Sequence, residues 1–206
     1  MTAELDPGPD PDSTNDTTLE TPRLELSFGT DEYAEELYPY VHGERGRAVT
    51  DNLVWDGPKT IDDIAGFFRK HTTGTFVPHG FHWLLRDRTG TITGRAGSPM
   101  GSIGINQKGP VGRCEVGYWL APPYWRRGLM TEALRAVIHH GFDNLGIVKI
   151  EADVFIGNAP GIALLESVGF VRERTLRRVH PKRGRWVDAH LYGIVPDDLT
   201  SVQANE

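Results

Sequence analysis

The sequence predicts a mixed α/β sheet within one domain, and three observations support this fold class. Segments with the two-residue period of strands alternate with segments of helical period. Pairs of strands separated by short turns are expected towards both ends of the chain. The chain has 206 residues, of which 38% are apolar and 24% charged. This length and composition are typical of one globular domain with a sizeable core.

Charge is distributed unevenly along the chain. Six of the 28 acidic residues fall within residues 1–20, which contain no Lys or Arg, so 22 acids and 22 bases remain elsewhere. The same segment is poor in apolar residues and contains three prolines. We therefore expect a disordered leader over residues 1–18, one domain over residues 19–198 and a C-terminal tail over residues 199–206. A neutral domain with an acidic leader disfavours nucleic acid as a partner.

Other composition features exclude further classes. No apolar run approaches the roughly 20 residues of a membrane span, and the first residues lack the pattern of a signal peptide. We expect a cytoplasmic protein with no membrane partner. Cys114 is the one cysteine, which excludes an internal disulfide and a thiolate metal cluster. His139 and His140 have no ligand at metal-binding spacing, so no metal is predicted.

The first half of the chain shows strand, helix and loop patterns in turn. The expected order is a strand over residues 22–26, a helix from Thr30, an irregular segment over 43–58, a helix after Thr60 and a strand over 81–86. Thr60 and Asp63 form a capping-box pattern, and Ile61, Ile64, Phe67 and Phe68 give that helix an apolar face. Glycines and a proline within residues 89–99 exclude a regular strand there. About ten residues therefore look inserted before a strand over 101–106.

The second half contains the most regular patterns. A strand over residues 115–120 ends at Pro122 and Pro123. A helix follows, with one apolar stripe formed by Met130, Ala133, Leu134, Val137 and Ile138. The remaining expected elements are an alternating strand over residues 148–154, a helix capped by Asn158 and ended by Gly169, and a hairpin over 171–179 and 185–194.

The start of the central helix has the features of an anion site. Between Trp125 and Leu129 there is no Ser, Thr, Asp or Asn to cap the first amide groups, and Arg126, Arg127 and Gly128 occupy the turn instead. Uncapped amides, the positive end of the helix dipole and two guanidinium groups favour a phosphate. The glycine patterns of the Walker A loop and of the dinucleotide fold are absent, which excludes these two nucleotide sites.

These residues resemble the GNAT acyltransferase family, whose acyl-CoA signature is Gln/Arg-x-x-Gly-x-Gly/Ala. The segment Trp-Arg-Arg-Gly-Leu-Met over residues 125–130 keeps the central Arg-Gly and departs at its first and last positions. The wider phrase over residues 115–133 is similar to the RimJ/RimL-type branch, which acetylates protein N-termini and other amines. Residues 158–170 are similar to a second family motif, with Gly161 in place of its serine, and Gly-x-Trp-x-Asp over residues 184–188 matches the family ending.

The resemblance covers residues 19–198 and implies the GNAT fold, a central mixed sheet flanked by helices. It also implies acetyl-CoA as cofactor, an amine acceptor that is a small molecule or a protein N-terminus, and a monomer or homodimer. The cofactor-binding residues that it implies are Leu120, Arg126, Arg127, Gly128, Leu129, Met130, Thr131 and Asn158.

Acyl transfer to an amine requires the ammonium form to lose a proton first. Glu115 lies on the strand before the anion site, on the same face as Gly117 and Trp119, and the resemblance implies that it is the general base. A solvent-exposed or ion-paired Glu115 is the structural alternative. Tyr118, on the opposite face of that strand, is the candidate proton donor in place of the serine missing at Gly161.

The aromatic residues Trp55, Trp83 and Trp119 are candidates to line an acceptor pocket, although buried aromatics more often belong to the core. The lone Cys114 has no evident His and acid partners, so direct attack by the amine is expected rather than a covalent acyl-cysteine. Because Gly161 lacks the side chain of the family serine, a second hypothesis stands beside the enzyme: a regulatory module that binds acyl-CoA without turnover.

Overall fold

The structure is a computed structural model that describes residues 18–71 and 80–203. The expected leader lies outside the described residues except for Thr18, and so do residues 204–206 of the expected tail. The first part of that tail belongs to a helix, α6, which runs from Pro196 to Gln203 and crosses the expected boundary at residue 198.

The described residues form an eight-stranded sheet in the order β1-β2-β3-β4-β5-β6-β8-β7. Every neighbouring pair is antiparallel except β5 and β6, which are parallel. The strands are β1 Leu19–Glu20, β2 Leu24–Phe28, β3 Phe81–Asp87, β4 Pro99–Gln107, β5 Arg113–Leu120, β6 Lys149–Phe155, β7 Val171–Lys182 and β8 Arg185–Ile194. The mixed sheet predicted from the sequence is confirmed.

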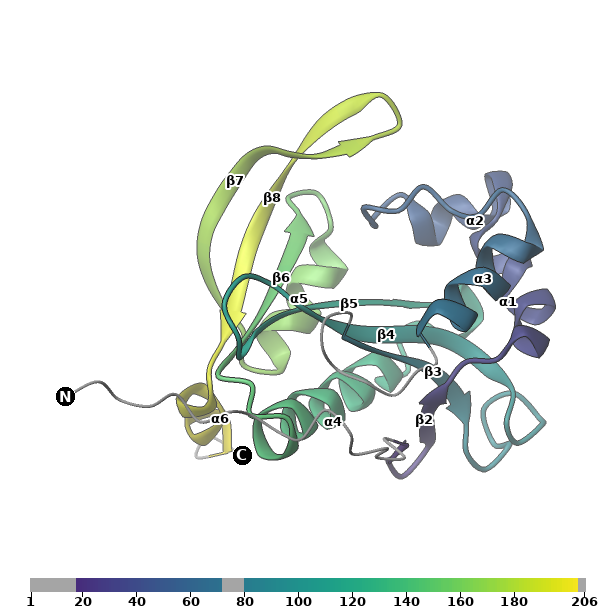
Figure 1. The fold of residues 1–206 in the computed structure, drawn as a ribbon, viewed down its shortest axis with the longest axis horizontal. Coiled ribbons are helices and arrows are strands. Elements are labelled where there is room, and N and C mark those ends of the chain that lie inside the picture. The colour runs from purple at the N-terminus through teal and green to yellow at the C-terminus, as the bar shows by residue number, and fades with distance from the viewer. Residues whose placement is uncertain (1–17, 72–79, 204–206) are drawn as a thin grey trace.

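Helices cover the sheet on both faces (Figure 1). The helices besides α6 are α1 Ala34–Val41, α2 Gly43–Thr50, α3 Ile61–His71, α4 Leu129–Asn144 and α5 Ala159–Ser167, with 3-10 turns η1 Asp31–Tyr33 and η2 Pro122–Tyr124. One core cluster joins α4 and α5 to the sheet, and a smaller one joins α1, α2 and α3 to Leu84 of β3 on the opposite face. The β7–β8 hairpin curves beyond the sheet towards α2 (Figure 1).

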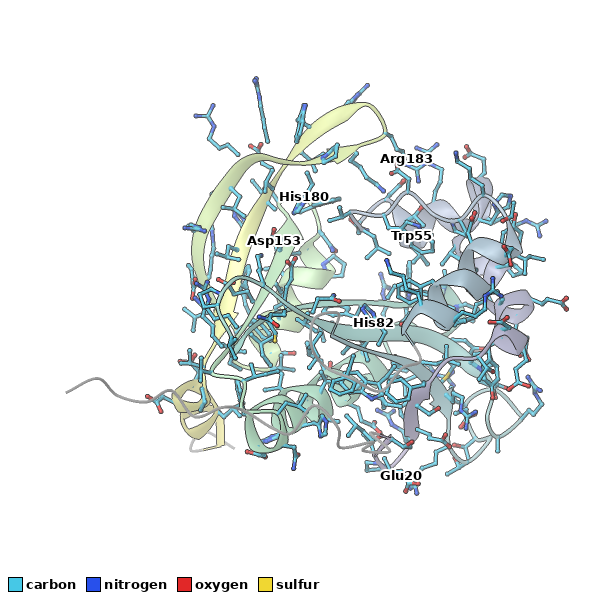
Figure 2. The ribbon with its side chains drawn as sticks, in the orientation of Figure 1. Glu20, Trp55, His82, Asp153, His180 and Arg183 are labelled. Carbon is cyan, nitrogen blue, oxygen red and sulfur yellow. The ribbon has the colours of Figure 1, made fainter. Side chains whose placement is uncertain are left out.

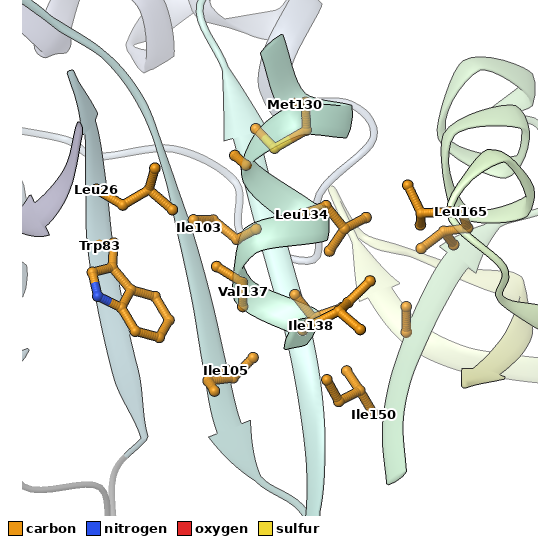
Figure 3. Close-up of a cluster of buried hydrophobic side chains, with 14 of the residues drawn as sticks. Leu26, Trp83, Ile103, Ile105, Met130, Leu134, Val137, Ile138, Ile150 and Leu165 are labelled. Atoms are coloured by element: carbon orange, nitrogen blue, oxygen red, sulfur yellow. The ribbon is translucent and has the colours of Figure 1, made fainter. Parts of the chain in front are cut away.

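The apolar stripe of α4 packs on the sheet as its period predicts. The buried residues of α4 are Leu129, Met130, Ala133, Leu134, Val137, Ile138 and Gly141. Figure 3 shows Leu134, Val137 and Ile138 beside isoleucines of β4 and β6, with Leu165 of α5 next to them. Burial of a Leu or Ile side chain stabilises a fold by roughly 1.5–3 kcal/mol, so this stripe fixes α4, and with it the turn before α4, against the sheet.

Two expectations for the segment before β3 need correction. The expected irregular segment over residues 43–58 contains helix α2, which packs on α1 and buries Val49. The capping box of α3 is confirmed: the amide of Thr60 donates to Asp63, and the amide of Asp63 donates to the Thr60 hydroxyl. However, Ile61 and Phe67 are largely exposed, because the buried face of α3 is formed by Ile64, Ala65 and Phe68.

The segment between β3 and β4 is held together by one buried carboxylate, that of Asp87. Its oxygens accept hydrogen bonds from the amides of Gly90, Ile92 and Thr93 at 2.9, 2.8 and 2.7 Å, and from the Thr93 hydroxyl at 3.0 Å. Burial alone would raise the pKa of Asp87, but these donors outweigh it and lower that pKa. Residues 89–98 contain no regular strand, as expected, but β4 begins at Pro99, two residues before the expected start.

Candidate functional site

The site begins where the two parallel strands separate. β5 and β6 are paired at Arg113–Lys149, Cys114–Ile150 and Glu115–Glu151. Beyond Glu115, β5 continues to Leu120 paired with β4, and β6 continues to Phe155 paired with β8, while the two strands diverge (Figure 1). The divergence leaves facing strand edges whose backbone groups are not paired with each other. Such edges can bind an extended ligand through main-chain hydrogen bonds.

A cavity of about 1010 Å³ occupies this divergence. It extends from the start of α4 and one side of α5, past β5 and β6, to the loop after α2 and the exposed side of α3. Of the residues that the sequence proposed for the site, eleven line the cavity: Trp55, Glu115, Tyr118, Trp119, Leu120, Arg126, Gly128, Leu129, Met130, Thr131 and Asn158. Arg127 and Trp83 are not among the lining residues.

The turn before α4 has the geometry of an anion site. Gly128 precedes the helix with φ 70°, and Arg126 also has a positive φ, 58°. No side chain caps the start of α4. Because glycine adopts this backbone region without strain, Gly128 allows the turn to pass directly into the helix. The first amides of α4 therefore border the cavity, with the exposed Arg126 beside them.

Two residues that the sequence analysis missed hold this turn from behind. Arg23 donates to the backbone carbonyl of Arg127 at 2.9 Å and to the Glu132 carboxylate at 2.6 Å. Glu132, in the first turn of α4, also accepts from the Thr21 hydroxyl at 2.5 Å and from the backbone amide of Arg23 at 2.9 Å. Burial would raise the pKa of Glu132, but these bonds and the Arg23 charge lower it. Nothing in the sequence indicates this contact, since its members are more than a hundred residues apart.

Trp125 differs from the residue that the family signature has at its first position, and it also fixes the turn before α4. Its indole N–H donates to the carbonyl of Leu120 at 2.5 Å, which links the turn to the end of β5. The bond places Trp125 and Leu120 at the same end of the cavity, where both line it.

Asn158 and Gly161 are in direct contact at the start of α5. The Asn158 side chain accepts a hydrogen bond from the Gly161 amide at 3.0 Å, which confirms the predicted cap. A Cβ atom at position 161 would lie 2.5 Å from the side-chain amide nitrogen of Asn158. A serine at position 161 would therefore require the side-chain end of Asn158 to shift from its present position.

Glu115 lies on the side of β5 opposite α4, as its alternation with the buried Cys114 and Val116 predicts. We call this side of β5 and β6 the open face and define it by Glu115, Gly117, Trp119 and Asp153. The Glu115 carboxylate is 36% exposed and forms an ion pair with Lys108 at 3.1 Å. Glu115 is therefore ion-paired, as the structural alternative expected, and it also lines the cavity, as a general base must.

Two further groups on β5 bear on the chemistry. Tyr118 lines the cavity, and burial raises the pKa of its hydroxyl, so this group stays protonated at neutral pH and can donate a hydrogen bond, although it is a weaker acid than a free tyrosine. Cys114 is fully buried in the core, and burial raises the pKa of its thiol to about 12. A thiol in this state is a poor nucleophile, which disfavours an acyl-cysteine route.

The three tryptophans proposed for the acceptor pocket lie in different places. Trp119 and Trp55 line the cavity, and Trp55 lies in the loop between α2 and α3. Trp83 is fully buried and stacks on Phe81 with ring centres 5.5 Å apart. Its alternation on β3 turns it towards the α4 side (Figure 3), so its position does not support a role in acceptor binding.

The tip of the β7–β8 hairpin closes over the loop that carries Trp55. Lys182 donates to the carbonyl of Trp55 at 2.9 Å and to the Asp56 carboxylate at 2.7 Å. Arg183 contacts the Thr50 hydroxyl and the Asp51 carboxylate, both at 2.9 Å. We call these four contacts the clasp. Figure 2 shows Arg183 at the hairpin tip above Trp55.

Two further properties of the described residues bear on the site. Within residues 18–71 and 80–203, no group of three or more His, Cys, Asp or Glu side chains is arranged to hold a metal ion. In the same residues, no helix has the length and apolar character needed to cross a membrane.

Comparison with known proteins agrees with this geometry. The family model described as acetyltransferase (GNAT) domain matches residues 23–171. The uncharacterized N-acetyltransferase YoaA of Bacillus subtilis is 29% identical over 178 residues, which are 86% of this chain and 96% of YoaA.

Two solved structures have the same fold. RimJ of Mycobacterium smegmatis, in complex with CoA-disulfide, has a TM-score of 0.73 at 20% identity and covers 85% of this chain and 83% of its own. The microcin C7 self-immunity acetyltransferase MccE, in complex with acetyl-CoA and AMP, has a TM-score of 0.72 at 18% identity over 85% of this chain and 91% of its own.

Proposed function

The chain belongs to the GNAT acetyltransferase family, and on that premise we propose that it is of the RimJ/RimL type and transfers an acetyl group from acetyl-CoA to a primary amine that meets the thioester at Glu115. The observation that carries this proposal is the cavity through the β5–β6 divergence. It joins the uncapped start of α4, at one end, to a carboxylate on the open face, at the other.

The residues at the α4 end fit coenzyme A. The pyrophosphate would accept hydrogen bonds from the first amides of α4, at the positive end of the helix dipole, with Arg126 beside it. Arg23 and Glu132 keep the Arg127–Gly128 turn in place for this contact. The pantetheine arm contains two amides, which suit the unpaired edges of β5 and β6. When bound, acetyl-CoA would supply the electrophilic thioester carbonyl.

The residues at the open face supply proton transfer. Glu115 accepts a proton from the acceptor ammonium and so leaves the amine lone pair free to attack. Tyr118 lies across β5 from Glu115 and keeps its proton at neutral pH, so it can donate a hydrogen bond to the departing thiolate, which is a stable leaving group without full protonation. The buried Cys114 does not line the cavity, which supports direct attack by the amine rather than a route through an acyl-cysteine.

The acceptor is a primary amine on a group slender enough to pass beneath the clasp. The names of two similar proteins point to different contexts: one in Escherichia coli is a ribosomal-protein-serine acetyltransferase, and MccE is a microcin C7 self-immunity acetyltransferase. Both a protein N-terminus and a small-molecule amine therefore remain within the proposal. No comparison favours the alternative of an acyl-CoA-binding module without turnover.

The test is CoA thiol release with a panel of slender primary amines, together with a direct measurement of CoA binding. We expect CoA to bind and at least one amine to release free thiol. Binding of CoA without thiol release for any amine would contradict acetyl transfer. Absence of CoA binding by the folded protein would contradict the whole site.

A further inference from the structure

A second carboxylate lies beside Glu115 on the open face. Asp153 is on β6, two residues beyond Glu151, which is the last residue of β6 paired with β5. The alternation of β6 buries Ile150, Ala152 and Val154 towards α4 and turns Asp153 to the open face. Asp153 lines the same cavity as Glu115 (Figure 2 labels Asp153).

Asp153 has one oxygen engaged and one without a donor. Its side chain is 5% exposed, and His180 of β7 lies 2.9 Å from Oδ2. The other oxygen, Oδ1, is buried, and no described residue forms a hydrogen bond with it. Burying a carboxylate oxygen without a donor is costly, and most buried polar atoms in proteins have a partner. An unsatisfied oxygen on a residue that lines a cavity is therefore placed to receive a donor from a ligand.

A primary ammonium group already lies close to both carboxylates. Lys108 Nζ is 3.1 Å from Glu115 and 3.7 Å from Asp153 Oδ1, an ion-pair distance longer than a hydrogen bond. Lys108 thus demonstrates that an alkylammonium fits near the two acids and leaves Asp153 Oδ1 incompletely satisfied. The three side chains together carry one net negative charge, which one further ammonium would neutralise.

We propose that Asp153 Oδ1 binds the ammonium group of the acceptor, beside Glu115, and that Lys108 competes with the acceptor for the two carboxylates. The ligand class is a primary alkylammonium on an unbranched arm, the same chemistry that Lys108 presents. The two carboxylates have different roles, because Asp153 anchors the cation in the buried part of the cavity while the more exposed Glu115 accepts its proton. This inference rests on the proposed function and assigns a specific anchor to its acceptor.

The test measures binding of butylammonium chloride to the CoA-saturated protein by ligand-observed NMR titration, so that no turnover is needed. Asp153→Asn keeps the size of the side chain and removes its charge, and we expect at least about tenfold weaker binding, equivalent to about 1.4 kcal/mol. Lys108→Met removes the competing ammonium and is expected to strengthen binding about threefold or more. The neutral analogue 1-butanol should compete with butylammonium in none of these proteins.

Glu44→Gln is the matched control, because Glu44 is an exposed carboxylate on α2 outside the cavity and should bind the probe as the unchanged protein does. CoA affinity and melting temperature report whether each variant is folded. If Asp153→Asn fails to fold, Lys108→Met still decides the question, since unchanged or weaker binding in that variant would overturn the competition.

Two results would overturn the assignment of Asp153: butylammonium binding that is equal in the unchanged protein and in folded Asp153→Asn, or no butylammonium binding in any of the proteins. If CoA binds normally in either case, the proposed acetyl transfer stands and the anchor is wrong. If CoA does not bind, the proposed function itself fails.

Discussion

The two ends of the cavity are built by different means. At the α4 end the groups that we propose for cofactor binding are backbone amides, and they are fixed by bonds between segments distant in the chain, such as those of Arg23 and Glu132. At the open face the groups that we propose for acceptor binding are charged side chains, Glu115 and Asp153, balanced by Lys108. A backbone site recognises a group common to every CoA ester. A site made of side chains can change its acceptor by substitution, without altering the fold.

The comparison predicts the largest effect at Glu115. Glu115→Gln should lower the rate of acetyl transfer by about a hundredfold to ten-thousandfold, the usual contribution of a positioned proton acceptor, and leave CoA affinity unchanged. The loss should shrink as the pH approaches the pKa of the acceptor amine, because neutral amine is then available without a base. Steady-state kinetics from pH 6 to 9 measure this, with Glu44→Gln as control. A rate within twofold of the unchanged protein across that range would assign proton transfer to another group or to water.

The second effect concerns stability near the α4 end. The amide of Arg88, next to Asp87, donates to the carbonyl of Arg23 at 3.0 Å, so the turn organised by Asp87 supports Arg23, which itself holds the turn before α4. Asp87→Asn replaces one carboxylate oxygen by an NH₂ group, which cannot accept hydrogen bonds from the surrounding backbone amides. We expect the free energy of unfolding to fall by about 2–3 kcal/mol at pH 7, measured by urea unfolding.

The pH dependence of this effect has a definite sign. The pKa of Asp87 is lowered in the folded protein, so its contribution is fully present above the unfolded pKa of about 3.9 and is lost as the pH falls through the folded pKa. The difference between the unchanged protein and Asp87→Asn should therefore diminish in acid. Asp143→Asn, at an exposed carboxylate of α4, should show no comparable difference at either pH. An equal loss at Asp143 would show that general charge, rather than the Asp87 bonds, is responsible.

The third effect concerns CoA affinity, and it tests the turn before α4 without changing the open face. Gly128→Val forces a β-branched side chain into φ 70° beside the proposed pyrophosphate position. CoA affinity should fall by at least about tenfold, which corresponds to about 1.4 kcal/mol, and calorimetric titration measures it.

Gly109→Val is the control for backbone strain, because Gly109 has φ 80° and open space around its Cβ position, in a turn that does not line the cavity. It should lose stability but not CoA affinity. Equal CoA binding by folded Gly128→Val and by the unchanged protein would remove the proposed cofactor site.

The smallest effect is expected at the clasp. Arg183→Met removes the contacts with Thr50 and Asp51 at a partly exposed site, so the free energy of unfolding should change by no more than about 1 kcal/mol. Acceptors too bulky to pass beneath the clasp should gain roughly twofold to fivefold in kcat/KM, while slender amines and CoA are unaffected. A parallel change for slender and bulky amines would show that the clasp does not select by size.

Local patterns predicted most of the elements because their causes are local. The stripe of α4, the capping box of Thr60 and Asp63, and the Asn158 cap depend on residues close to one another along the chain. The α2 helix was missed because its sequence, with two glycines and few apolar residues, has little helical signal, and contacts with α1 stabilise it. Trp83 is a candidate for either the acceptor pocket or the core on sequence grounds, because the sequence does not reveal which face of a strand meets a helix.

By itself, the sequence determined the order of the central strands and helices from β3 to β8, the uncapped Arg-Gly turn before α4 and the face of β5 that carries Glu115. Each of these follows from spacing along the chain, through the periods of strand and helix or the needs of a helix start. The tertiary structure alone decided which distant residues complete the site: Arg23 behind the turn, Asp153 with its partner His180 on the open face near Glu115, and Lys182 bonded to the loop of Trp55. These contacts join different strands and helices, and their distances depend on how β5 and β6 diverge and how the β7–β8 hairpin curves. The divergence and the curvature leave no local pattern in the chain.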